Sequence, residues 1–183
     1  AITRNGGVGD SAIQVLDQVD FQQLSLSNGA GGTYSHATVV WDGDDNLGAA
    51  DEIDFDGLRG TPPGPGADLT FSGLTDTLNL LVKANDTNGI EAIITLYAND
   101  NVSAVLSLSP STDNNQTLSY RFSDFIIVGD PAAFDITDVG AIRLELVSDE
   151  NSTGADMDIA LIEASSSVNV TMVDTVFDSN GAA

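Results

Sequence analysis

"FSDFIIVGDPAAFDITDVGAIRLELVSDENSTGADMDIALIEA", residues 122–164, is the stretch that decides the fold. Apolar and polar residues alternate there with a period of two, once from 141 and again from 156, across a Ser-Asp-Glu-Asn turn. This period is typical of a strand that has one face in a core and the other in water. The inward residues are predicted to be Ile142, Leu144 and Leu146, between Arg143 and Glu145, and then Met157, Ile159 and Leu161, alternating with Asp156, Asp158 and Ala160.

The same alternation recurs through the rest of the chain, between connectors rich in Gly, Asn and Asp. Within 130–140, Asp130 and Pro131 predict the entry to one helical turn. About ten short strands without crossover helices predict an all-β fold, a two-sheet antiparallel β-sandwich or jelly roll. The other predicted strands are 34–41, 68–71, 78–83, 90–97, 102–109 and 118–122, with a continuous apolar run at 125–128.

Residues 122–164 also resemble the closing third of jelly-roll modules in secreted bacterial and archaeal proteins. In those modules a strand, an F-D-(L/I/F)-T-(D/N)-V-G-A-I turn and two amphipathic strands complete the sandwich. The stretch is similar both to galactose-binding-like carbohydrate modules and to surface proteins with a PEP-CTERM sorting tag, although this chain ends in DSNGAA without the tag. The resemblance implies secretion, and it implies core positions for Phe134, Ile136, Val139, Ile142 and Leu144.

The two ends of the sequence differ from its middle. Residues 1–32 are predicted to be an N-terminal extension or strand with a Gly-rich linker, 33–164 the sandwich core, and 165–183 a C-terminal strand or tail. In the tail, Val168, Val170 and Met172 alternate with more polar residues. Either terminal segment could be an edge strand of its own domain or a strand donated to a neighbouring subunit, in which case these three residues would make the subunit contact.

Charge excludes several partners. The 183 residues include 28 acidic and five basic ones, a net charge of −23. A field of that sign repels nucleic acid and anionic membranes, and it attracts cations. No apolar run is long enough to span a membrane, so membrane insertion is not expected.

Other features of the composition bear on chemistry and location. The absence of cysteine excludes thiol chemistry, and a single histidine argues against a Ser-His-Asp triad or a multi-histidine metal site. The start at Ala1 fits removal of a signal peptide, and we expect an extracellular or cell-surface protein. Glycosylation sequons, which could equally reflect polar loop composition, occur at Asn85, Asn101, Asn115, Asn151 and Asn169.

The acidic run "WDGDDNLGAADEIDFDG" (41–57) is the most concentrated group of possible ligands. It begins like an EF-hand loop, but Leu47 stands where that loop needs Gly and Ile53 where it needs Glu. Two interpretations stay open, a solvated acidic turn and a different Ca²⁺ site. The candidate ligands of such a site are Asp42, Asp44, Asn46, Asp54 and Asp56.

Catalysis is not expected from this sequence. Glu91 and Glu145 lie opposite the core residues of their strands, where solvated side chains belong, and His36 is predicted to be a half-exposed strand residue. Trp41 and Tyr97 are the best candidates for a platform that stacks against sugar rings, with ordinary core or rim aromatics as the alternative.

Two functions are therefore predicted. The first is an extracellular structural subunit that assembles with itself into a filament or surface matrix by adding a terminal strand to a neighbour. The alternative is a calcium-stabilised module that binds a polysaccharide.

Overall fold

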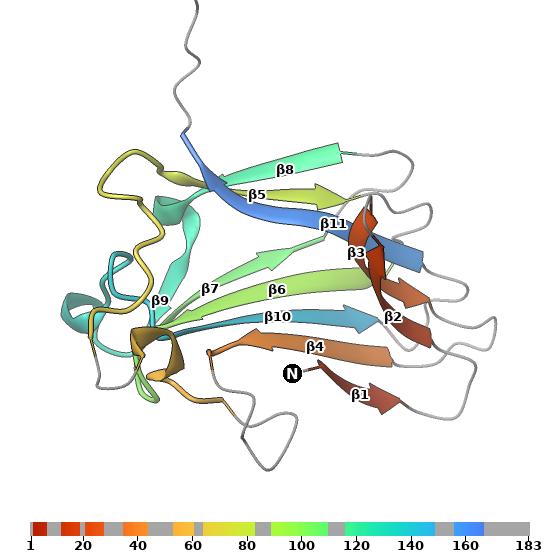
Figure 1. The fold of residues 1–183 in the computed structure, drawn as a ribbon, viewed down its shortest axis with the longest axis horizontal. Helices are drawn as coiled ribbons and strands as arrows, with labels where there is room; N and C mark the ends of the chain where they lie inside the picture. The colour runs from red at the N-terminus through yellow and green to blue at the C-terminus, as the bar shows by residue number, and fades with distance from the viewer. Residues whose placement is uncertain are drawn as a thin grey trace, which may run out of the picture.

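The computed structural model is a two-sheet antiparallel β-sandwich, which confirms the predicted fold class (Figure 1). The structure describes residues 2–6, 12–18, 21–27, 35–43, 53–60, 64–82, 89–109, 116–148 and 156–166. Sheet A has the strand order β1-β4-β10-β6-β7-β9, and sheet B has the order β2-β3-β11-β5-β8. The strands of sheet A are Ile2–Gly6, Ser35–Trp41, Ala141–Ser148, Ile90–Tyr97, Ser103–Leu108 and Ile126–Val128, in that order. Those of sheet B are Ala12–Gln18, Phe21–Ser27, Asp156–Ser165, Thr77–Val82 and Gln116–Arg121.

Strand β10 shows why this sequence makes a sandwich. Leu144 and Leu146 are almost fully buried between the sheets, while Arg143 and Glu145 lie on the opposite side of sheet A. Each buried aliphatic side chain contributes roughly 1.5–3 kcal/mol relative to exposure. Other buried residues of this core include Leu26, Leu80, Val82, Ile90, Ile94, Leu96, Leu106, Leu108, Val139, Met157 and Ile159.

The five positions implied by the resemblance lie in or against this core. Val139 and Leu144 are buried, and Phe134, Ile136 and Ile142 are partly buried and packed against the cluster. The predicted helical turn is the 3-10 turn η3, Pro131–Ala133, in which the Asp130 carboxylate accepts a hydrogen bond from the Ala132 N–H. Two further 3-10 turns are η1, Gly57–Arg59, and η2, Phe122–Asp124.

Strands from the predicted N-terminal extension belong to the sandwich. β1 pairs with β4 in sheet A, and β3 pairs with β11 in sheet B. These strands precede the predicted boundary at residue 32, so in the structure both sheets include residues from 1–32. Residues 167–183 lie outside the described residues, as does their predicted subunit contact through Val168, Val170 and Met172.

The predicted strand 68–71 is wrong, because the segment is a turn. The Asp68 carboxylate accepts hydrogen bonds from the N–H groups of Thr70 and Ser72, so these two groups are bonded within the turn, whereas the Leu69 N–H donates to the Ile136 carbonyl oxygen. Phe71 and Ser72 have positive φ angles of 48° and 61°, which a strand cannot contain. Only Ala67 makes a β-bridge, to Val139.

Strand β11 departs from simple alternation. Its pairing with β5 shifts register between Ile159 and Leu161, so one residue is inserted. Beyond this irregularity Ile162 packs against the core, one residue later than the alternation through Leu161 predicts. Figure 1 shows that the described loops 53–60, 64–76 and 122–140 gather at one end of the sandwich, at the left of the view. Among the described residues, no helix is long and apolar enough to cross a membrane.

Candidate functional site

Four side chains from three adjacent strands form a cluster on the outer face of sheet A, the side away from the core. We call His36, Tyr97, Arg143 and Glu145 the outer-face cluster. Residues directly opposite each other in an antiparallel sheet point to the same side. His36 lies opposite Val147, on the face that Arg143 and Glu145 share. Tyr97 lies opposite Ala141, on the same face.

The cluster is held by a chain of polar contacts. His36 Nε2 donates a hydrogen bond to Glu145 Oε1 at 3.0 Å, and an Arg143 Nη2 lies 2.8 Å from Glu145 Oε2. The Glu145 side chain is only 15% exposed. Glu145 was predicted to be solvated, and this is wrong: it is on the predicted face, but a guanidinium and an imidazole replace its water. The predicted half-exposed position of His36 is confirmed by its partial burial.

Arg143 joins this polar group to an aromatic ring. Its guanidinium carbon lies 5.5 Å from the centroid of the Tyr97 ring, within the range of a cation–π interaction. The Tyr97 ring also meets the Phe55 ring edge-on, with centroids 5.2 Å apart. Arg143 Nε is buried without a hydrogen-bond partner, so the guanidinium reaches its partners through its terminal nitrogens.

Tyr97 is held as a neutral phenol. Burial raises its pKa above the usual 10.0, while the nearby Arg143 charge acts in the opposite direction. At neutral pH the hydroxyl therefore stays available as a hydrogen-bond donor. A phenol, a guanidinium, a carboxylate and an imidazole on one sheet face can together bind a polar, uncharged molecule that offers hydroxyl groups and a C–H face.

The two predicted platform aromatics do not share a surface. Trp41 lies opposite Ile142 in the β4–β10 register, whereas Tyr97 lies opposite Ala141. Because consecutive residues of a strand point to opposite faces, Tyr97 is on the outer face and Trp41 is on the side of the other sheet. They therefore cannot form one platform.

The acidic run of 41–57 is partly described. The buried Asp42 carboxylate accepts a hydrogen bond from the Asp54 N–H at 3.1 Å, and Asp54 accepts one from the Asp56 N–H. Asp56 lies 3.1 Å from Arg59 Nε. Asp44 and Asn46 lie outside the described residues, and the residues that are described contain no group of three acidic or histidine side chains placed to hold a metal ion. The calcium site therefore stays a prediction.

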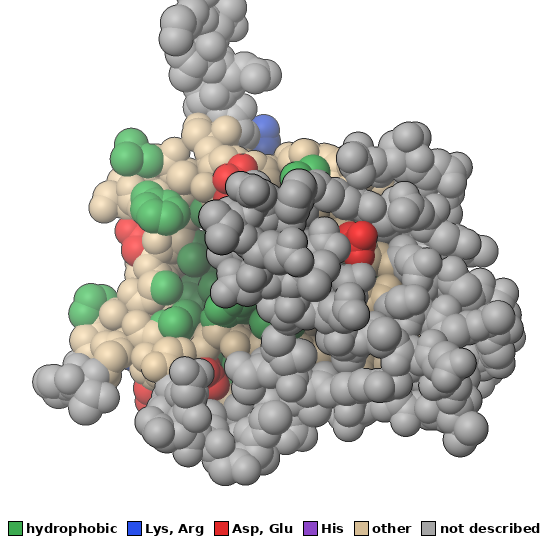
Figure 2. Space-filling view, turned by 45° about the vertical axis from the view of Figure 1, so that its right-hand side comes forward, with side chains coloured by type: hydrophobic (Ala, Val, Ile, Leu, Met, Phe, Trp, Pro, Cys, Tyr) green, Lys and Arg blue, Asp and Glu red, His purple; other side chains and the backbone are tan. Residues whose placement is uncertain are grey.

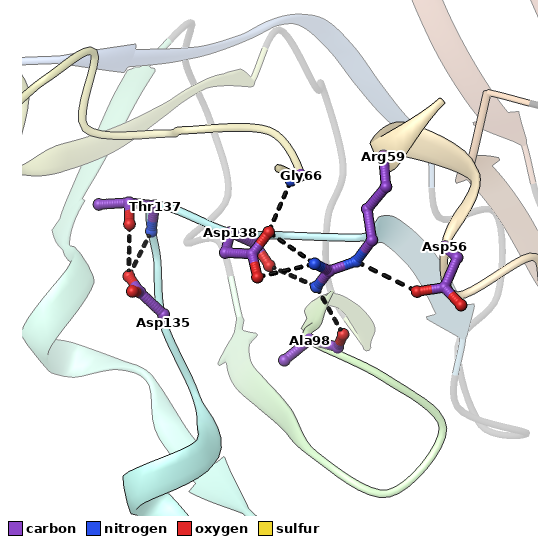
Figure 3. A network of polar contacts seen from close by, with 7 residues as sticks. All are labelled: Asp56, Arg59, Gly66, Ala98, Asp135, Thr137 and Asp138. Atoms are coloured by element: carbon purple, nitrogen blue, oxygen red, sulfur yellow. Dashed lines mark hydrogen bonds and ion pairs between the residues drawn. The ribbon is translucent and has the colours of Figure 1, made fainter. Parts of the chain in front are cut away.

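Arg59 connects the loops at this end of the sandwich (Figure 3). Its guanidinium donates two hydrogen bonds of 2.6 and 2.7 Å to the Asp138 carboxylate and two more to the carbonyl oxygens of Ala98 and Asp138. Asp138 also accepts a hydrogen bond from the Gly66 N–H. Arg59 thus ties the 53–60 loop to the loops that contain residues 66, 98 and 138.

Acid should weaken this connection. The hydrogen bond from Arg59 and, secondarily, the one from Gly66 hold the pKa of the Asp138 carboxyl below its usual 3.8. A depressed folded-state pKa gives stability that is complete above the unfolded value and is lost as the pH falls through the folded value. We expect Asp138→Asn to be less stable than the wild type at about pH 7, and the difference to narrow below about pH 4. Urea unfolding across this range measures it, and a difference that stays constant with pH would contradict the assignment.

Of the predicted glycosylation sites, only Asn101 is described. It lies exposed in the turn between β6 and β7, where its N–H donates a hydrogen bond to the Asn99 side chain. Asn85, Asn115, Asn151 and Asn169 lie outside the described residues. Glycosylation stays a prediction at all five positions.

Comparison with solved structures identifies the fold class. A family 11 carbohydrate-binding module from Clostridium thermocellum, solved in complex with a beta-1,3-1,4-mixed-linked tetrasaccharide, superposes with a TM-score of 0.50. It is 13% identical, and the match covers 90% of this chain and 88% of that one. PfGH50B superposes with the same TM-score at 10% identity, over 92% of this chain and 23% of that one.

At these identities the likeness shows the β-sandwich fold. It agrees with the resemblance of residues 122–164 to jelly-roll carbohydrate modules. No family model matches the sequence, and no curated protein matches it significantly.

Reasoning from the sequence missed the contacts through which Arg59 and Arg143 organise their surroundings. One signal was available, because the chain has only five basic residues among 28 acidic ones. In such a chain each cation has many possible carboxylate partners, so each is a candidate to organise a cluster. Which carboxylate each one meets is decided by contacts between segments distant in the sequence.

Proposed function

We propose that this protein is a non-catalytic, extracellular polysaccharide-binding module that holds its ligand on the outer face of sheet A. The outer-face cluster carries the proposal, because it places an aromatic ring beside charged hydrogen-bonding groups on the central strands of a sheet. The fold likeness to a carbohydrate-binding module solved with an oligosaccharide supports it.

Each member of the cluster has a role in binding. The Tyr97 ring offers apolar area to the C–H face of a sugar, and its hydroxyl donates a hydrogen bond. Arg143 supplies N–H donors from the guanidinium that lies beside the Tyr97 ring, and Glu145 accepts from sugar hydroxyls. Because the groups already hold one another, little side-chain entropy is lost when the ligand binds.

Glu145 is suited to binding rather than to acid–base catalysis. Both of its oxygens already contact a partner, one the His36 ring and the other the Arg143 guanidinium. A general acid in glycoside hydrolysis must hold a proton and be paired with a second carboxylate across the scissile bond. The cluster contains one carboxylate, in keeping with a module that does not cleave its ligand.

Net charge narrows the class of polysaccharide. At −23 the protein repels polyanions such as uronate-rich or sulfated chains. A neutral polysaccharide carries no such penalty. We therefore expect binding to neutral chains that depends only weakly on salt.

Tyr97→Ala should reduce affinity for a neutral polysaccharide at least about tenfold, because stacking area and a donor are lost together. Tyr97→Phe should lose less, since it keeps the ring. Affinity electrophoresis in gels that contain different neutral polysaccharides identifies a ligand, and calorimetry then measures each variant.

Trp41→Phe is the matched control, because Trp41 lies on the opposite side of sheet A. Its affinity should equal that of the wild type. If Trp41→Phe loses binding while Tyr97→Ala keeps it, the outer face is not the site. If no neutral polysaccharide retards the wild-type protein, the proposed function itself fails.

A further inference from the structure

A second candidate site lies between the sheets, at the end that carries the loops. It is an open cavity of about 320 Å³. Glu163 is the only ionisable residue among the described residues that line it. Figure 2 shows hydrophobic side chains gathered at this end of the molecule, with acidic side chains nearby. The lining includes Trp41, Phe71, Leu96, Ile142, Ile162 and Ala164.

The chemistry of this cavity differs from that of the outer-face cluster. Sugar hydroxyls need several hydrogen-bonding partners, and this wall is apolar apart from Glu163, whose carboxylate accepts a hydrogen bond from Asn79 on the outer face of sheet B. Its rim is nevertheless exposed, since Trp41 is 42% and Phe71 59% accessible to solvent. Large apolar side chains exposed beside an apolar cavity mark a surface that binds an apolar partner.

The turn that contains Phe71 holds that side chain at the rim of the cavity. Phe71 is a non-glycine residue at positive φ, a conformation that costs energy. The Asp68 carboxylate holds the turn by accepting hydrogen bonds from the Thr70 hydroxyl and from the N–H groups of Thr70 and Ser72. Phe71 is thus kept at the rim rather than being folded into the core.

The chain itself supplies a segment of suitable chemistry. Strand β11 runs along the cavity, where Ile162, Glu163 and Ala164 line it, and it ends at Ser165. In the sequence that follows, Val168, Val170 and Met172 fall on alternate positions. In an extended segment these three side chains would share one side. Such a row of aliphatic side chains matches a narrow apolar cavity.

The 168–172 segment is better placed to enter the cavity of a second copy than the cavity of its own chain. Along the cavity β11 pairs with β5, from Ile159 to Ser165, whereas its pairing with β3 covers only Asp156 to Ile159, so a returning strand of the same chain could reach the other side of β11 only through a hairpin. A tight return would also need turn residues such as Asn-Gly or Asp-Gly, and residues 165–167 are three serines. The chain leaving Ser165 is therefore better placed to reach a neighbouring molecule.

We propose that the cavity beside Trp41 and Phe71 receives the 168–172 segment of a second copy of this chain. Contacts of this head-to-tail kind generate chains of molecules when they do not close into a ring. The proposal gives a site to the assembly predicted from the sequence, and it does not depend on glycan binding.

The net charge of the chain predicts how association should depend on salt. Each copy carries −23, so two copies repel each other and association should strengthen as salt screens this repulsion. Glycan binding to the outer-face cluster should respond weakly to the same change. Salt thus distinguishes the two sites.

Trp41 is the only tryptophan, so its fluorescence reports directly on the rim of the cavity. For the full-length protein we expect the emission to shift to shorter wavelength as concentration rises. Light scattering on the same samples should show larger species, and the effect should be greater at about 0.5 M salt than at about 0.05 M. An emission and a mass that do not change with concentration or salt would overturn the proposal.

Matched variants locate both halves of the contact. Replacing Val168, Val170 and Met172 with serine should abolish assembly and the shift, whereas replacing Asn169, Thr171 and Val173 with serine should preserve them. On the cavity side, Phe71→Ser should weaken association at least about tenfold. Leu74→Ser should not, because Leu74 is 75% exposed and is absent from the described lining.

A final measurement separates a second copy from the chain's own segment. A synthetic peptide of residues 167–178 is added to the variant with serine at 168, 170 and 172, and it should restore the fluorescence shift. If the wild type instead shows the short-wavelength emission as a monomer at every concentration, and the serine variant loses it, the segment fills its own cavity and the proposal is wrong. Polysaccharide affinity measured on the same variants should be unchanged, so each proposal can fail separately.

Discussion

Arg59→Met should lower the free energy of unfolding by about 3 kcal/mol. The guanidinium side chain is only 15% exposed and makes four hydrogen bonds, to Asp138 and to the Ala98 and Asp138 carbonyl oxygens. Methionine keeps much of the aliphatic stem but removes every donor, which leaves buried acceptors without partners. The Asp138 carboxylate is 39% exposed and is partly solvated after the change, so the expected loss lies at the lower end for a buried pair.

Urea unfolding followed by circular dichroism measures this loss. Arg59→Lys keeps the charge but cannot form the forked contact, and it should retain only part of the stability. Arg121→Met is the control, because that arginine is exposed, and its change should stay within about 0.5 kcal/mol. If Arg59→Met and Arg121→Met unfold at the same urea concentration, Arg59 does not hold the loops together.

Gly57→Ala should be at least as damaging, through sterics alone. A Cβ atom on Gly57 would coincide with the carbonyl oxygen of Asp42, and one on Gly43 would press against the Gly57 carbonyl. Two segments of backbone pass each other at this point, and neither can move freely because Gly57 is the first residue of η1 and Asp42 directly follows β4. We expect a loss of about 3 kcal/mol or more, at the upper end for an overpacked site.

Gly64→Ala provides the comparison. An added Cβ there meets only the Arg59 carbonyl oxygen, at 3.3 Å. Neither Gly57 nor Gly64 has the positive φ that would add backbone strain. The Gly64 variant should therefore lose much less stability in thermal and urea unfolding. Equal losses in the two variants would show that the close approach of residues 42 and 57 is not responsible.

Strand β10 shows how far the sequence predicts the structure. The placement of Leu144 and Leu146 inside and of Arg143 and Glu145 outside follows from the period of two, which is a local property of any strand. The hydrogen-bond partners of Glu145 could not be predicted in this way. His36 lies 109 positions away in the sequence, and no pattern in either segment indicates that the two meet.

The failed prediction at 68–71 has a similar cause. Leu69 and Phe71 alternate with polar residues as in a strand, but the Asp68 side chain captures the backbone N–H groups that a strand would need. The aspartate itself favours a turn, since its side chain often accepts a hydrogen bond from the backbone N–H two residues later. Whether it does so depends on the absence of a neighbouring strand, which is a tertiary property.

The prediction of a platform made by Trp41 and Tyr97 shows most clearly what sequence alternation indicates and what strand pairing decides. Sequence alternation indicated that Tyr97 is on the polar face of its strand, and the structure confirms this. It did not indicate that Trp41 faces the other way, because that depends on the register in which β4 pairs with β10. The sequence alone determined that this is an acidic, all-β sandwich with alternating strands, because composition and periodicity are local. Tertiary structure decided which charges meet and which face each aromatic ring occupies, because pairing register is a relation between distant segments.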